Sequence, residues 1–272
     1  MAAPFARTPE PWDAGLHERN PAEARFEHYL RELEYDFVHH PDLGNGKHPD
    51  YLVQGLNQEF VCEVKSFNTA GAFQAAQVGT RSQKEILAPI RNLIKQASKQ
   101  LKGIRDRPLV VVLANPRACP VPLGPFSVMA AMYGDVTIEI PVSGEEVTGD
   151  VTWTTGDNRR LYVVDPETGE QVGGHHEYIS AVAILRQEDL AFREWSRQWK
   201  EQNRVFSDAT KEAVALLEEA SGEAVPHSND IFLDIFETFS DCAVSLRRDV
   251  FNGPHDRRWI PNDTRTALVP LT

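Results

Sequence analysis

The chain has 272 residues, of which 41% are hydrophobic and 25% charged, with a formal net charge of −12 at pH 7. These values are typical of a soluble globular chain, long enough for one large domain or two small ones. No apolar run is long enough to span a membrane, and no signal peptide is recognisable, so we expect a cytoplasmic protein that does not bind membranes. The widely spaced Cys62, Cys119 and Cys242 argue against disulfides or a thiolate zinc site.

The N-terminal part of the chain predicts an irregular arm followed by an amphipathic helix. Residues 1–20 are rich in proline and polar side chains, which is typical of an irregular arm. Asn20 and Pro21 suit the N-cap and the first position of a helix. Apolar residues then recur at helical spacing and should face the core: Phe26, Leu30, Leu33 and Phe37.

Two short apolar segments after this helix predict a β-hairpin. The first is Tyr51–Val53 and the second is Phe60–Val64, with glycine and polar turn residues between them. Because side chains alternate across a strand, Glu63 and Lys65 should point to the same face. Asp50 directly precedes the first strand. Two carboxylates and one ammonium group can therefore meet at one end of the hairpin.

This combination of side chains suits metal-assisted cleavage of a phosphodiester. Carboxylate oxygens are hard ligands for Mg²⁺ or Mn²⁺, and Mg²⁺ usually keeps several waters and takes one or two protein carboxylates. A lysine beside the ion can help to deprotonate an attacking water or neutralise charge on a phosphate. The bland alternative is a solvated Glu–Lys pair, which is common on soluble proteins.

The residues Pro49-Asp50, followed by Glu63-Val64-Lys65, resemble the signature of the PD-(D/E)xK superfamily, the restriction-endonuclease-like nucleases. The resemblance implies that Asp50 and Glu63 are metal ligands, with the Val64 carbonyl as a possible third ligand. It also implies that Lys65 is the catalytic lysine.

The resemblance further implies supporting residues on the helices that flank the hairpin. In this family the first helix often carries a glutamate near the metal, commonly after an apolar residue, and Glu27 fits this pattern better than Glu23. Several branches place a glutamine or lysine on the helix after the motif, a part that Gln100 suits. The alternatives are that both glutamates are ordinary surface acids and that Gln100 only borders a buried face.

A basic segment follows the hairpin. Residues 81–117 hold nine lysines and arginines against two acids, a net charge of +7, whereas the rest of the chain carries −19. Apolar spacing predicts a helix from about Pro89 to Gly103 within this segment. Basic side chains form a row along its successive turns: Arg91, Lys95, Lys99 and Lys102. Such a row often only solvates a helix, but its position after the motif favours contact with nucleic-acid phosphates.

The continuous apolar run Pro108–Asn115 predicts a strand that is buried on both faces. Helix, hairpin, basic helix and buried strand then follow one another in the order of the α-β-β-α-β core of the resembled family. We therefore expect an α/β protein with a restriction-endonuclease-like core, a mixed central sheet, and a C-terminal elaboration of helices and strands.

The rest of the chain predicts extensions of this core. We expect a nuclease-like domain over 21–186, with a solvated hairpin insertion at 143–175, and a C-terminal helical accessory region over 187–272. The predicted elements are a short helix at 126–133, strands at 136–142, 178–185 and 231–239, and one or two helices over 188–220.

A pair of adjacent histidines, His175 and His176, precedes Glu177. Neighbouring residues on a strand face opposite ways, so these histidines cannot easily share one metal ion. A structural or exposed role is the favoured interpretation.

The predicted function is a Mg²⁺- or Mn²⁺-dependent nuclease, with DNA favoured over RNA. The resemblance alone suggests a setting in restriction, phage defence or repair. The sequence holds no recognisable module for reading nucleotide sequence, so loops, a homodimer or a partner subunit would select the target. The net charge of −12 favours an alternative, a catalytically idle subunit of the same fold that binds nucleic acid or assembles a complex. A third possibility is an unrelated α/β protein with a chance motif, in which Asp50 and Glu63 would point apart.

Overall fold

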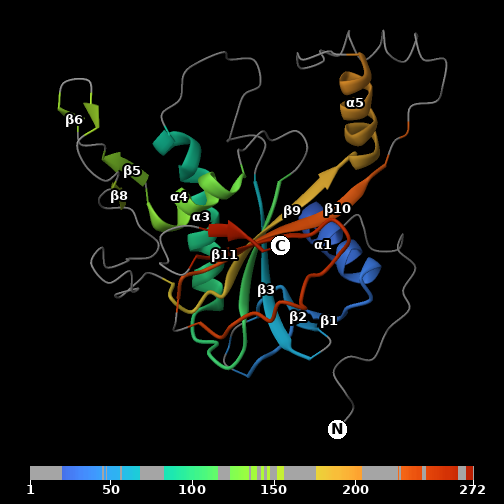
Figure 1. Cartoon of the computed structure of the whole chain (residues 1–272). Helices are drawn as coiled ribbons and strands as arrows, with labels where there is room; N and C mark the ends of the chain where they lie inside the picture. Colours follow the sequence, from blue (N-terminus) through green and yellow to red (C-terminus); the bar gives the residue numbers. More distant parts are fainter. Residues whose placement is uncertain are drawn as a thin grey trace. The chain divides into compact units, whose positions relative to one another are not determined.

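The computed structural model of the chain describes residues 20–44, 46, 48–55, 57–67, 83–115, 123–134, 136–139, 142–143, 146–147, 152–155, 176–203, 226, 228–240, 243–262 and 268–271. It divides into two compact units, Met1–Leu185 with Phe232–Thr272, and Arg186–Ile231. The structure is of the α/β class, as predicted (Figure 1).

A mixed sheet of eight strands dominates the structure, in the order β1-β2-β3-β4-β9-β10-β11-β12. Strands β1, β2 and β3 are antiparallel, β3, β4 and β9 are parallel, β11 runs parallel to β10, and β12 is antiparallel to β11. The strands are β1 (Asp36–His39), β2 (Tyr51–Gln54), β3 (Glu59–Ser66), β4 (Leu109–Ala114), β9 (Ala181–Glu188), β10 (Asp230–Glu237), β11 (Arg257–Pro261) and β12 (Leu268–Pro270).

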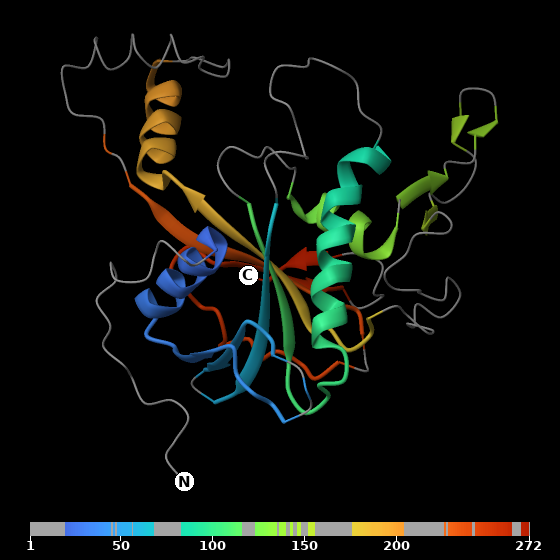
Figure 2. The same cartoon turned by 180° about the vertical axis from the view of Figure 1, so that it is seen from behind.

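Helices α1 (Pro21–Glu32) and α3 (Gln83–Leu101) pack on opposite faces of the predicted hairpin, which β2 and β3 form. On one face, the ring of Phe26 from α1 meets that of Tyr51 edge-on, with centroids 5.4 Å apart. On the other face, Leu52 joins the core cluster that contains Ile90 and Ile94 of α3. The two helices flank β3 and β4 in Figure 2. The predicted alternation of side chains along the hairpin is therefore confirmed.

Helix α1 begins where the sequence predicted and ends earlier. Asn20 caps the helix, since its side-chain oxygen accepts a hydrogen bond from the backbone N–H of Ala22 at 3.0 Å. Phe37 does not continue the helical stripe, which corrects the expectation. It lies in β1, an unpredicted strand, and its ring packs against Tyr51 with centroids 5.8 Å apart. Pairing of β1 with β2 decides the conformation of this segment.

The helix after the hairpin is longer than predicted. It begins at Gln83, so Pro89 lies inside it rather than at its start. After α3 the chain enters β4, in which every residue is buried, as the apolar run predicted. The predicted short helix is present as α4 (Pro125–Tyr133).

Smaller elements follow α4 outside the main sheet. Strand β5 (Val136–Glu139) pairs with β8 (Thr152–Thr155), and β6 (Val142–Ser143) pairs with β7 (Glu146–Val147). Helix α5 (Leu190–Asn203) belongs to the smaller unit, where the Asp189 carboxylate accepts hydrogen bonds from the backbone N–H groups of Phe192 and Ser228. None of the helices in the described ranges has the length and hydrophobicity of a membrane span.

The C-terminal part of the predicted accessory region contributes strands to the main sheet. The predicted strand at 231–239 is β10, and β11 and β12 extend the sheet beyond it. Several predictions lie outside the described residues: the arm up to residue 19, much of the hairpin insertion, and any helix over 204–220. Cys119 and Cys242 also lie outside them, whereas Cys62 is buried as a free cysteine.

The carboxylate of Asp256 joins α1, β10 and the loop that precedes β11. It accepts hydrogen bonds from the Tyr29 hydroxyl at 2.6 Å and from the backbone N–H groups of Gly253 at 2.7 Å and Leu233 at 2.8 Å. Tyr29 is almost fully buried, so its hydroxyl depends on this acceptor. Burial and the Asp256 charge raise the pKa of Tyr29, which keeps the hydroxyl protonated as the donor.

Replacing Asp256 by alanine should therefore lower the free energy of unfolding by about 3 kcal/mol, because three donors lose their acceptor together. Urea denaturation followed by circular dichroism measures this loss. Asp249→Ala is the matched control, since the Asp249 carboxylate pairs with Arg247 at the exposed surface. It should leave stability nearly unchanged, and an equal loss in both variants would contradict the structural role of Asp256.

Candidate active site

The side chains of Asp50, Glu63 and Lys65 meet at one end of the β2–β3 hairpin. Lys65 Nζ lies 2.5 Å from Glu63 Oε1 and 3.8 Å from Asp50 Oδ2. The alternation along β3 places Glu63 and Lys65 on one face, and Asp50 approaches them from the residue before β2. Lys65 is therefore within ion-pairing distance of both predicted motif carboxylates.

Hydrogen bonds to the backbone hold the two carboxylates in place. Tyr51 and Cys62 are the last paired residues at this end of β2 and β3. Beyond them, the two carboxylates link the chain segments by side-chain hydrogen bonds. Glu63 Oε2 accepts a hydrogen bond from the backbone N–H of Asp50 at 3.2 Å, and Asp50 Oδ2 accepts one from the backbone N–H of Val64 at 2.7 Å. The carboxylate of each residue thus holds the backbone of the segment that carries the other residue.

The burial of Glu63 makes it the unusual acid of this group. Its side chain is 0% exposed, whereas those of Asp50 and Lys65 are 10% and 21% exposed. Burial and the nearby Asp50 charge raise the pKa of Glu63 to about 7, although the hydrogen bond from Lys65 acts in the opposite direction. The pKa of Glu63 therefore lies near neutral pH, and strongly shifted pKa values of this kind are common at functional sites.

Glu27 contacts Tyr51 on the α1 face of the hairpin, whereas Glu63 and Lys65 point to the opposite face. Glu27 is buried, and its carboxylate accepts hydrogen bonds from the Tyr51 hydroxyl at 3.1 Å and from Arg31 Nη2 at 2.7 Å. Burial and the charge of Glu27 raise the pKa of Tyr51, so the phenol remains the proton donor. Because Tyr51 is the first residue of β2 and directly follows Asp50, Glu27 supports the strand that begins after Asp50.

The structure does not bring Gln100 to the site. Gln100 is exposed in the last turn of α3, and the Tyr178 hydroxyl donates to the Ser98 carbonyl in that turn at 2.7 Å. This end of α3 lies beside the start of β4, because the helix runs back along the sheet. Lys65 pairs with Leu113 instead, about 13 Å further along β4 at the usual rise per residue.

The predicted row of basic residues is only partly at the surface. Arg91 is buried, and its Nη2 donates a hydrogen bond to the Ala130 carbonyl of α4 at 3.0 Å. Arg91 therefore links α3 to α4. This burial corrects the expectation that Arg91 lies at the surface to contact nucleic-acid phosphates. Lys95, Lys99 and Lys102 are exposed, as expected.

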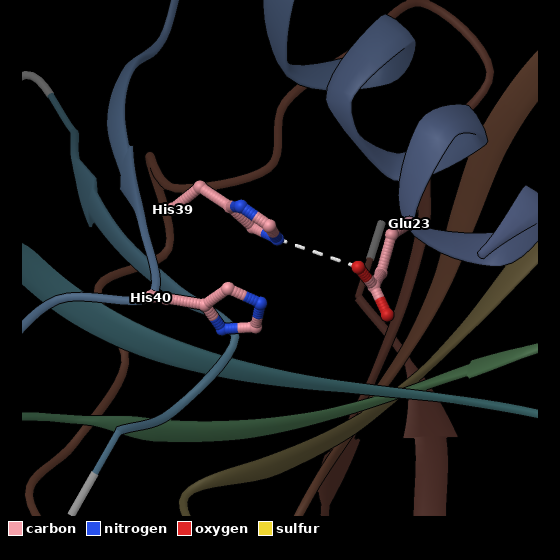
Figure 3. A group of neighbouring side chains, drawn as sticks. All are labelled: Glu23, His39 and His40. Atoms are coloured by element: carbon pink, nitrogen blue, oxygen red, sulfur yellow. Dashed lines mark hydrogen bonds and ion pairs between the residues drawn. The ribbon is translucent and has the colours of Figure 1, made fainter. Parts of the chain in front are cut away.

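Sequence reasoning missed a second group of polar side chains beside the hairpin. Glu23 Oε2 of α1 lies 3.3 Å from His39 Nε2 at the end of β1, and His40 follows directly (Figure 3). The backbone N–H of His40 donates to the Asp50 carbonyl at 2.9 Å. The consecutive histidines are visible in the sequence, but no local pattern indicates that they lie beside Glu23. The other pair is described only in part, since His175 lies outside the described residues.

The chain matches no protein-family model, no curated protein and no solved structure. Function must therefore be inferred from the arrangement of its own side chains.

The raised pKa of Glu63 predicts how stability depends on pH when no metal is present. The folded state holds the Glu63 proton up to about pH 7, whereas an unfolded glutamate releases it near 4.5. As the pH rises from about 4.5 to about 7, the free energy of unfolding of the wild type should therefore fall by up to ~3 kcal/mol relative to that of Glu63→Gln. Urea titrations of both proteins in EDTA between pH 4 and 8 measure the difference, and a difference independent of pH would contradict the assignment.

Proposed function

We propose that the chain is a metal-dependent nuclease that hydrolyses phosphodiester bonds of nucleic acid. The observation that carries this proposal is the convergence of Asp50, Glu63 and Lys65. A chance motif on an unrelated protein would leave the two carboxylates pointing apart. Their hydrogen bonds from the backbone N–H groups of Asp50 and Val64, and their common partner Lys65, support a dedicated site.

The donor set fits Mg²⁺ or Mn²⁺. Asp50 and Glu63 would hold the ion through hard carboxylate oxygens, with the Val64 carbonyl as a further candidate ligand. When bound, such an ion supplies an acidified water and neutralises charge on the phosphate. Lys65 Nζ lies within 4 Å of both carboxylates. As an ammonium it can stabilise charge on a phosphate oxygen, and after releasing a proton to solvent it can take one from the attacking water.

The order of elements supports membership of the PD-(D/E)xK superfamily. Helix α1, strands β2 and β3, helix α3 and strand β4 follow one another as expected for a restriction-endonuclease-like core, with β1 inserted before β2. The motif residues lie on the hairpin, as the resemblance requires. We therefore infer that the first half of the main sheet is a nuclease core.

DNA is the proposed substrate. The exposed side chains of Lys95 and Lys99 on α3, and of Lys102 directly after it, can neutralise backbone phosphates, and they lie in a segment that carries +7. Phosphate contacts position a nucleic acid without reading its sequence. Target selection would then come from a second copy of the chain or from a partner subunit, in restriction, phage defence or repair.

A catalytically idle subunit is the second candidate. The net charge of −12 opposes binding to nucleic acid, and the burial of Arg91 removes one of the predicted phosphate contacts. Such a subunit would retain the fold and lack metal-dependent cleavage, so the same experiment separates the two candidates.

Cleavage of single- and double-stranded DNA and RNA by the purified full chain tests the proposal. We expect DNA cleavage with Mg²⁺ or Mn²⁺ and none in EDTA. Asp50→Asn removes the charge but keeps an oxygen that can accept from the Val64 N–H, and Lys65→Met keeps the aliphatic stem. Each variant should reduce cleavage by at least ~100-fold, since it removes a metal ligand or a proton-transfer group.

Asp106→Asn is the matched control, because Asp106 is an exposed carboxylate in the loop before β4. It should cleave like the wild type, and circular dichroism verifies the folding of every variant. Wild-type protein without cleavage would favour the idle subunit. Cleavage that survives in both folded site variants would exclude this site as its origin.

The exposed lysines predict a non-specific contribution to binding. Lys99→Ala should weaken binding of Asp50→Asn protein to DNA duplexes of different sequence by a similar factor, and lower the slope of log affinity against log salt by about 1. Fluorescence anisotropy at several salt concentrations measures both quantities. Arg197→Ala, which removes an exposed arginine paired with Glu194 and Glu201 in the smaller unit, is the control and should bind like its parent. Equal losses in both variants would contradict a specific contact by α3.

A further inference from the structure

We infer a second metal site, formed by Glu23, His39 and His40 and suited to a transition-metal ion such as Zn²⁺. One ligand atom from each of these residues lies within 4.8 Å of the other two. The imidazole rings at the end of β1 and the carboxylate on the first turn of α1 face one another in Figure 3. This histidine cluster uses none of the proposed nuclease residues, and the inference goes beyond the proposed function.

The backbone of His40 explains how two consecutive histidines can share an ion. Neighbouring residues on a regular strand point to opposite faces, which normally keeps adjacent side chains apart. His39 is the last residue of β1, and His40 adopts the left-handed region with a φ of 48°. This conformation costs roughly 1–2 kcal/mol for a residue with a Cβ atom. It leaves the two rings with centroids 3.8 Å apart.

The distances are compatible with one ion. Ligand atoms bound at ~2.0–2.1 Å to a tetrahedral zinc ion are ~3.3 Å apart. Glu23 Oε2 and His39 Nε2 are separated by 3.3 Å. The ring of His39 packs against that of Tyr51, with centroids 5.0 Å apart, which restricts its orientation. His40 is exposed, so its ring can turn toward the other two ligands without disturbing the core.

The chemistry of the ligands separates this site from the proposed nuclease site. Two imidazoles and one carboxylate form a three-ligand set used by catalytic zinc sites, which leaves a position for water. Imidazole favours zinc, cobalt, nickel and copper, whereas Mg²⁺ prefers sites made of oxygen atoms. Asp50 and Glu63 offer carboxylate oxygens, so the two sites should select different ions.

An ion in the histidine cluster would connect α1 to the end of β1, which pairs with the segment around Asp50. His39 pairs with Tyr51 across β1 and β2, and the backbone N–H of His40 donates to the Asp50 carbonyl at 2.9 Å. Glu23 lies in the first turn of α1. Binding therefore fixes the start of α1 and the end of β1 beside the nuclease hairpin.

Metal binding by the metal-stripped full chain tests the inference. Co²⁺ is the optical probe, Zn²⁺ the competitor, and millimolar Mg²⁺ remains present throughout. The wild type should bind one equivalent of Co²⁺ with visible absorption bands, and Zn²⁺ should displace it. His39→Gln and His40→Asn should each weaken Co²⁺ binding by at least ~10-fold, since even partners outside the ligand set contribute that much. Asparagine also tolerates the left-handed backbone at position 40.

His28→Gln is the matched control, because His28 lies on α1 and pairs with Glu32 outside the cluster. This variant and Asp50→Asn should both bind Co²⁺ like the wild type. The inference is overturned if the wild type binds no Co²⁺ or if both histidine variants bind it unchanged. It is also overturned if Asp50→Asn loses the ion while the histidine variants retain it, because the ion then belongs to the hairpin.

Discussion

A buried carboxylate, that of Glu63, is the constraint on which the proposed site depends. Removing a carboxylate from water is costly unless hydrogen bonds or opposite charges replace the water. Glu63 obtains these from the backbone N–H of Asp50 and from Lys65 Nζ. The same interactions bring Asp50 and Lys65 to one point. The burial that raises the pKa of Glu63 thus occurs where these three side chains meet, at the place where the proposed divalent cation would replace a proton.

The surrounding sheet makes this arrangement rigid. Strand β3 lies between β2 and the fully buried β4, and α1 and α3 cover opposite faces of the hairpin. Functional side chains on such elements are held more precisely than side chains on loops. Strand β1 adds His39 of the histidine cluster on the side of β2 away from β3, so β2 lies between the strands that carry His39 and Glu63.

Local patterns predicted the elements whose signals are unambiguous. Asn20 caps α1, the hairpin side chains alternate as expected, and the apolar run of β4 is buried throughout. Phe37 fits helical spacing as well as a strand, and only pairing with β2 decides between them. The sequence pattern places Arg91 among the surface cations, but in the structure α4 packs over it and the Ala130 carbonyl accepts its hydrogen bond. The histidine cluster depends on the backbone angle of His40, which the sequence does not specify. The sequence therefore predicts that Asp50, Glu63 and Lys65 lie together, whereas tertiary packing determines which side chains surround them.

Mn²⁺ binding followed by electron paramagnetic resonance tests the central claim, that Asp50 and Glu63 form one metal site, without relying on a chosen substrate. Wild-type protein and His40→Asn should bind Mn²⁺ with the same affinity, because this ion prefers carboxylate ligands. Asp50→Asn and Glu63→Gln should each weaken its binding by at least ~10-fold. Unchanged affinity in both folded carboxylate variants would contradict the claim that these side chains converge to hold a catalytic metal.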